Sequence, residues 1–194
     1  GHKKENINNV DMVVVSSAIK QNNPEFIKAK SMDIPILPRA KMLSEILHLK
    51  SSITIAGSHG KTTTTSLVAS LFEEAKLDPT VINGGIINTY KTNAKLGKGE
   101  WIIAEADESD GSFTYLPSTI CLVNNIDPEH LDYYGSFKKL KTAFLNYVEK
   151  IPFYGFASLC IDHKDVREIM KSLKNKKIIT YGFSKKANFS IKNN

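Results

Sequence analysis

Residues 57–65 read Gly-Ser-His-Gly-Lys-Thr-Thr-Thr-Thr and directly follow a short apolar run. A strand that leads through a glycine-rich turn into a helix points backbone N–H groups and the positive end of the helix dipole at one place, which suits a polyphosphate. Gly57 and Gly60 permit a close backbone approach, Lys61 can reach the outer phosphates, and Thr62 offers a hydroxyl to Mg²⁺. The segment predicts a binding loop for ATP or GTP. Its expected contact residues are Gly57, Ser58, His59, Gly60, Lys61, Thr62 and Thr63.

The loop departs from the strict pattern G-x-x-x-x-G-K-[ST], because Ile55 occupies the place of the first glycine. A short G-x-x-G-K-T form is a modest signal, and the alternative is a glycine-rich turn with a solvated lysine. The preceding strand and a following helix favour the phosphate loop. Apolar residues recur in that helix at Leu67, Val68, Leu71, Phe72 and Ala75.

Carboxylates follow another apolar strand, at residues 105–113, which read Glu-Ala-Asp-Glu-Ser-Asp-Gly-Ser-Phe. The carboxyl ends of strands are where open α/β sheets bind ligands, and carboxylate oxygens suit Mg²⁺. We therefore expect Glu105, the first of them, to serve a cation. The alternative is an acidic, solvated turn.

A third apolar strand leads into residues 124–132, which contain His130. We expect this histidine to ligate a second cation or to steady a phosphate, because acidic side chains surround it in sequence. The alternative is a structural histidine, which is how we interpret His2, His48 and His163.

Strand and helix patterns alternate along the chain, which predicts an α/β fold with a mainly parallel sheet. The expected strands are residues 10–15 (of the buried type), 34–37, 52–56, 80–83, 101–106, 119–124, 158–161 and 177–181. The expected helices are residues 24–30, 40–49, 137–150 and 165–173, besides the helix after the loop. A domain boundary is expected near residues 50–51.

Composition narrows the function classes. The 194 residues carry a net charge of +6, with 41% hydrophobic and 24% charged residues, as in ordinary globular domains. Neither a membrane span, a signal peptide nor a nucleic-acid motif is evident, so we expect a cytoplasmic protein without membrane or nucleic-acid partners. Cys121 and Cys160 lie in apolar runs and are expected to be reduced thiols of the core.

Together the three motifs resemble successive signatures of the Mur ligases. Further similar segments extend the resemblance over nearly the whole chain, at residues 13–19, 23–25, 38–43, 83–85 and 93–97. The resemblance implies a P-loop-type central ATPase domain at 51–194, preceded at 1–50 by the tail of a Rossmann-like domain that binds a UDP-sugar. It also implies a fragment that lacks part of the first domain and the whole C-terminal domain, and that does not ligate by itself.

Within the family, the motifs are most similar to the members that join L-alanine to UDP-N-acetylmuramate in peptidoglycan synthesis. The resemblance implies an ATP-dependent reaction through an acyl phosphate, with these two compounds as substrates and ATP and Mg²⁺ as cofactors. By the same resemblance, Lys61 holds the β- and γ-phosphates, Thr62 and Glu105 bind one Mg²⁺, and His130 helps to bind a second. Ser16, Ser17 and Arg39 are assigned to the UDP-sugar domain.

Three alternatives stay open. One is a murein-peptide recycling ligase, whose acidic motif resembles D-E-Y-D-x-A-F. Ser109 and Ser112 in the acidic motif of this chain favour the alanine-adding members instead. A folylpolyglutamate synthetase usually carries Asn in place of His59. The last alternative is a nucleotide-binding module without catalysis.

Overall fold

The computed structural model describes residues 1–87 and 92–191, so Asn193 and Asn194, with which the sequence ends, lie outside the described residues. Two compact units divide the chain, at residues 1–46 and 47–194, and each is described by itself. The division falls within a few residues of the boundary expected near residues 50–51.

The first unit contains a short parallel pair of strands and the helices around it. Its elements are η1 (Lys4–Asn6), β1 (Val13–Val15), α1 (Pro24–Ser31), β2 (Ile36–Pro38) and α2 (Arg39–Leu47), whose last residue belongs to the second unit. Helix α1 begins where it does because the Asn23 side chain accepts hydrogen bonds from the backbone N–H groups of the first turn, with proline at the first helical position.

The prediction of a buried strand at residues 10–15 was wrong in extent and in type. Strand β1 begins only at Val13, and Val14 is 45% exposed. The reason is that β1 pairs only with β2 within the described residues, and a two-stranded sheet leaves much of its surface uncovered.

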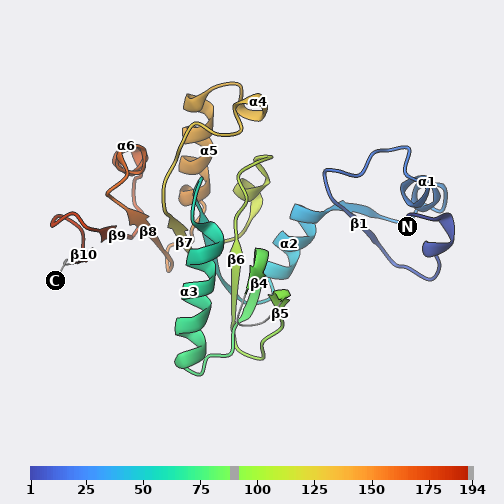
Figure 1. Ribbon diagram of the computed structural model, residues 1–194, viewed down its shortest axis with the longest axis horizontal. Helices are drawn as coiled ribbons and strands as arrows, with labels where there is room; N and C mark the ends of the chain where they lie inside the picture. Colours follow the sequence, from blue (N-terminus) through green and yellow to red (C-terminus); the bar gives the residue numbers. More distant parts are fainter. Residues whose placement is uncertain (88–91, 192–194) are drawn as a thin grey trace. The chain divides into compact units, whose positions relative to one another are not determined.

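The second unit is an α/β domain around an eight-stranded sheet of order β10-β9-β8-β7-β3-β6-β4-β5 (Figure 1). Its strands are β3 (Ser51–Ala56), β4 (Thr80–Ile87), β5 (Thr92–Lys95), β6 (Trp101–Glu105), β7 (Ile120–Val123), β8 (Phe156–Cys160), β9 (Ile178–Gly182) and β10 (Phe189–Ser190). Its helices, apart from the end of α2, are α3 (Lys61–Glu74), η2 (Ser112–Tyr115), α4 (Leu131–Tyr134), α5 (Phe137–Glu149) and α6 (Lys164–Ser172). Every described pairing is parallel except that of β4 with β5, which confirms the predicted fold class.

Alternating side chains of β3 face opposite layers of the domain, as the two-residue period of a strand requires. Ile53 and Ile55 join a buried cluster with Ala69 of α3. Thr54, between them, hydrogen-bonds the Tyr147 hydroxyl of α5. Helices α3 and α5 therefore cover opposite faces of the sheet.

Strand β3 lies between β6 and β7, and this position determines where a ligand can bind. Ile55 is in register with Glu105 on one side, and Ala56 with Val123 on the other. The chain leaves β3 toward β4 and leaves β7 toward β8, so the winding direction reverses here. The carboxyl ends of β3, β6 and β7 thus meet at a topological switch point.

Several local features differ from the predictions. Strand β5 is polar and mostly exposed at the sheet edge, so it lacks the alternation that indicates a strand. Strand β8 begins at Phe156, two residues earlier than predicted. In α3, Val68 and Phe72 pack against the core, whereas Leu67 and Leu71 are 61% and 69% exposed.

Candidate nucleotide and cation site

The loop between β3 and α3 has glycine where its backbone requires it. Gly57 has φ +145°, and a Cβ there would lie 3.1 Å from Asn124 Cβ and 3.3 Å from Asn125 N. Gly60 has φ +77° and caps the N-terminus of α3. Larger residues at either position meet strain, and at Gly57 they also meet the segment that follows β7.

Hydrogen bonds fasten the loop to this neighbouring segment. The backbone N–H of His59 donates to Asn125 Oδ1 at 2.8 Å, and that of Ser58 donates to the Asn125 carbonyl at 3.3 Å. The N–H of Asp127 donates in turn to the Ser58 hydroxyl at 2.8 Å. These contacts hold the loop against the segment that follows β7.

Asn124, directly after β7, links α3 to β9. Its side-chain amide donates to the Thr64 hydroxyl at 2.9 Å, and its carbonyl oxygen accepts from the Tyr181 hydroxyl at 2.7 Å. Burial raises the pKa of Tyr181, so this hydroxyl remains a proton donor.

Lys61 lies at the centre of the site and contacts a buried carboxylate. Its Nζ is 3.0 Å from Glu108 Oε1 and 2.9 Å from Oε2, and it also donates to the carbonyl oxygens of Gly57 at 2.7 Å and Ser58 at 3.3 Å. The Glu108 side chain is only 1% exposed. A buried carboxylate needs such a partner, because an unpaired charge in this position is costly.

Thr62 and Glu105 meet on the other side of the loop. The Thr62 hydroxyl donates to Glu105 Oε2 at 3.0 Å, and the same oxygen accepts the N–H of Gly84 at 3.0 Å. A Cβ on Gly84 would lie 3.1 Å from both carboxylate oxygens, and one on Gly85 would lie 3.3 Å from Thr62 Cγ2. Hydroxyl and carboxylate oxygens beside two glycines form a donor set that fits Mg²⁺.

His130 precedes α4 in a left-handed conformation, with φ +54°. Its Nε2 lies 3.9 Å from Glu108 Oε1. Within the described part of the chain, Glu108, Glu129 and His130 form a group whose ligand atoms lie within 4.8 Å of one another, so together they could hold a cation. The structure thus places His130 beside Glu108.

Two further histidines flank Asp127. His59 Nε2 lies 3.5 Å from Asp127 Oδ2 and 3.7 Å from Glu129 Oε1. His163, interpreted from sequence as structural, has its Nε2 3.4 Å from Asp127 Oδ1. One carboxylate oxygen of Asp127 therefore lies near His59 of the loop, and the other lies near His163, the residue before α6.

The predicted site residues of the second unit gather at this one edge of the sheet, and their roles stay predictions. Thr63 is exposed on the first turn of α3, and Ser16, Ser17 and Arg39 belong to the first unit. Glu108 and Asn124 were not singled out, although each belongs to a motif that was recognised. The described residues contain no helix of the length and apolarity that a membrane crossing requires.

A mainly parallel α/β sheet with a phosphate-type loop at its switch point places the second unit among P-loop-type proteins. The model of the Mur ligase middle domain matches residues 55–194, and that of the Mur ligase family catalytic domain matches residues 1–51. The chain belongs to the Mur ligase family.

Its relatives include a UDP-N-acetylmuramate–L-alanine ligase of Rhodospirillum rubrum, 57% identical over 187 residues, which are 96% of this chain and 39% of the relative. The UDP-N-acetylmuramate-alanine ligase structure from Thermotoga maritima is 27% identical with a TM-score of 0.81, covering 96% of this chain and 42% of that one. The structure of UDP-N-acetylmuramate:L-alanyl-γ-D-glutamyl-meso-diaminopimelate ligase from Neisseria meningitides shares the fold at 21% identity. Its TM-score is 0.82, with 94% of this chain and 62% of that one covered. The chain spans about two fifths of the length of the curated relatives it matches.

Proposed function

We propose that this chain supplies the ATP- and Mg²⁺-binding part of a ligase that joins L-alanine to UDP-N-acetylmuramate. The observation that carries the proposal is the site at the switch point. Lys61 and Thr62, at the start of α3, contact Glu108 and Glu105 of the acidic motif that ends β6, in a chain more than half identical to alanine-adding ligases.

In the proposed reaction, the muramate carboxylate attacks the γ-phosphate of ATP, ADP leaves, and the amine of L-alanine then displaces phosphate from the acyl phosphate. A carboxylate is a poor electrophile, and phosphorylation provides the leaving group. Lys61 and the N–H groups at the start of α3 neutralise and orient the phosphates, which is the main contribution a protein makes to phosphoryl transfer.

Thr62 and Glu105 would hold one Mg²⁺, and His130 with Glu108 a second. When bound, these ions neutralise charge on the transferring phosphoryl group. Lys61 already contacts the Glu108 carboxylate, so phosphate binding requires the ammonium group either to leave Glu108 for the phosphate or to contact both. Fastening of Ser58 and His59 to the segment after β7 keeps the loop aligned during that exchange.

Nucleotide binding tests the first half of the proposal on the chain itself. Titration calorimetry with Mg·ADP should show binding that Lys61→Ala weakens by roughly 2–4 kcal/mol, the size of one preorganised charge contact. Lys171→Ala, at an exposed position of α6, is the matched control and should bind like the parent. Equal affinity of the Lys61 variant would remove the loop from the proposal.

Ligation is tested by exchanging the matching segment of the Rhodospirillum rubrum relative for this chain, since the two are 57% identical. The chimera should release phosphate and form UDP-N-acetylmuramoyl-L-alanine, whereas its Lys61→Ala and Glu105→Ala forms should not. Circular dichroism verifies that each chimera is folded. A folded chimera without ATP-dependent turnover would refute the proposal. Turnover with the tripeptide L-alanyl-γ-D-glutamyl-meso-diaminopimelate alone would favour the recycling ligase.

A further inference from the structure

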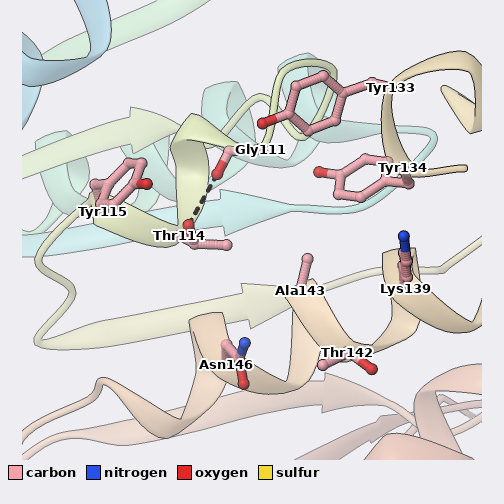
Figure 2. A pocket seen from close by; sticks show the side chains of 9 residues that line it. All are labelled: Gly111, Thr114, Tyr115, Tyr133, Tyr134, Lys139, Thr142, Ala143 and Asn146. Carbon is pink, nitrogen blue, oxygen red and sulfur yellow. Dashed lines mark hydrogen bonds between the residues drawn. The ribbon is translucent and has the colours of Figure 1, made fainter.

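A second concave site lies in the second unit, next to the nucleotide and cation site described above. A cavity of about 310 Å³ opens between η2, α4 and α5 (Figure 2). This volume is at the lower end of the range for small-molecule sites. Its lining consists of Gly111, Thr114, Tyr115, Tyr133, Tyr134, Lys139, Thr142, Ala143 and Asn146.

Aromatic rings form one wall of this cavity. Tyr133 is 58% exposed and meets Tyr134 edge to face, with 4.9 Å between ring centroids. The Tyr134 hydroxyl is already used, because it donates to the Glu108 carbonyl at 2.5 Å. Burial raises the pKa of Tyr134, so this bond holds the ring as a fixed wall. Tyr133 therefore presents ring surface to an occupant of the cavity.

The opposite wall, from α5, is positively charged. Lys139 has no ion-pair partner among residues 1–87 and 92–191, and it lies in the first turn of α5, where the helix dipole is positive. The lining contains no carboxylate. In Figure 2 the Lys139 amine points from α5 toward the tyrosines.

Polar groups beside Lys139 can still accept or donate hydrogen bonds. The Thr142 hydroxyl uses its proton on the Lys138 carbonyl at 3.0 Å and keeps its lone pairs, and the Thr114 hydroxyl does the same toward Gly111 at 2.8 Å. The Asn146 amide makes no hydrogen bond within the described residues. The cavity thus combines ring surface, one uncompensated cation and free amide donors.

We propose that this cavity binds a small aromatic anion, with its ring against Tyr133 and its anionic group at Lys139. An uncharged aromatic ligand would leave Lys139 without a partner, and an anion without a ring would leave the Tyr133 ring uncovered. The site is separate from the phosphate loop, because none of the residues at 57–63 lines it. Its lining reaches Glu108 through that residue's backbone carbonyl, which accepts the Tyr134 hydroxyl and the Gly111 N–H. The proposal does not depend on ligase activity.

The experiment is a titration of the ¹⁵N-labelled chain with benzoate, followed by nuclear magnetic resonance. Benzoate should shift the amides of Lys139, Thr142 and Asn146 saturably. Acetate lacks the ring and benzyl alcohol lacks the charge. Each should bind about tenfold more weakly than benzoate, because each loses one of the two proposed contacts, and tenfold corresponds to about 1.4 kcal/mol. Phenyl phosphate in place of benzoate distinguishes a phosphate ligand from a carboxylate ligand by its relative affinity.

Two variants and one competition complete the test. Lys139→Gln and Tyr133→Ala, both at exposed positions, should weaken benzoate binding about tenfold, whereas the neighbouring Lys138→Gln should not change it. Saturating Mg·ADP should leave benzoate binding unchanged. Equal binding of benzoate and acetate, parental affinity of Lys139→Gln, or displacement of benzoate by ADP would each overturn the proposal.

Discussion

Replacing Glu108 by Gln should destabilise the second unit, because it removes the charge that Lys61 contacts. The two groups are 2.9 Å apart, and the side chains of Glu108 and Lys61 are 1% and 14% exposed. Breaking a buried ion pair costs about 3–5 kcal/mol. Lys61 keeps the carbonyl oxygens of Gly57 and Ser58 as acceptors, which places the loss at about 3 kcal/mol, the lower end of that range.

The assay is denaturant unfolding followed by the emission of Trp101, the only tryptophan of the chain, which lies in β6 of the same unit. The free energy of unfolding in water should fall by about 3 kcal/mol. In thermal unfolding, the same loss corresponds to a fall in melting temperature of roughly 6–12 °C for a domain of this size. Asp132→Asn is the control, since Asp132 is exposed and has no ion pair among the described residues. Its effect should stay within about 0.5 kcal/mol.

A double-mutant cycle with Lys61→Met separates the ion pair from other effects of the substitutions. The Lys61 variant leaves the Glu108 carboxylate buried without its cation and should cost about 4 kcal/mol. The double variant removes both charges, so the coupling energy should reach about 2–3 kcal/mol. Additive losses, or a Glu108→Gln variant as stable as the parent, would refute the reasoning.

Three further predictions concern the loop and the core. Gly57→Ala should lower the free energy of unfolding by about 1–3 kcal/mol and weaken Mg·ADP binding. The reason is that residue 57 has φ +145° and that the added Cβ would lie 3.1 Å from Asn124 Cβ. Thermal unfolding measures the first effect and titration calorimetry the second. Burial raises the pKa of the Cys121 thiol to about 12, so in the native protein a thiol reagent at pH 8 should modify the partly exposed Cys160 and spare Cys121, and equal rates would contradict this. Since burial also raises the pKa of Tyr147, the folded state holds these protons more tightly than the unfolded chain. Stability should therefore fall as pH rises from about 9 toward 12, which unfolding midpoints at several pH values would check.

The position of the site could be predicted from sequence because three strands end in polar motifs, and parallel strands bring such ends to one edge. The partner of Lys61 could not. The acidic motif offers several carboxylates, but Asp107 and Asp110 accept backbone N–H groups two residues further on, from Ser109 and Ser112, at 3.0 Å each. These local turns use the aspartates and direct Glu108 inward, which spacing alone does not reveal.

Edge elements were also beyond sequence reasoning. Strand β5 is recognisable only from its partner β4, because its own side chains face solvent. The short helix α4 lies between two residues in the left-handed conformation, His130 and Gly135, and is too short to produce a helical period. Such elements depend on tertiary contacts more than on local pattern.

The contact between Lys61 and Glu108 also bears on how fast the proposed site would capture a polyphosphate. Because the carboxylate neutralises the lysine, this part of the site adds little to the field that attracts an approaching anion, and the net charge of +6 comes from lysines distributed along the chain. Long-range attraction then brings the ligand to the domain without directing it to the loop. We expect the local step, in which the Lys61 ammonium group moves from carboxylate to phosphate, to limit binding. The association rate should then depend on that exchange more than on ionic strength.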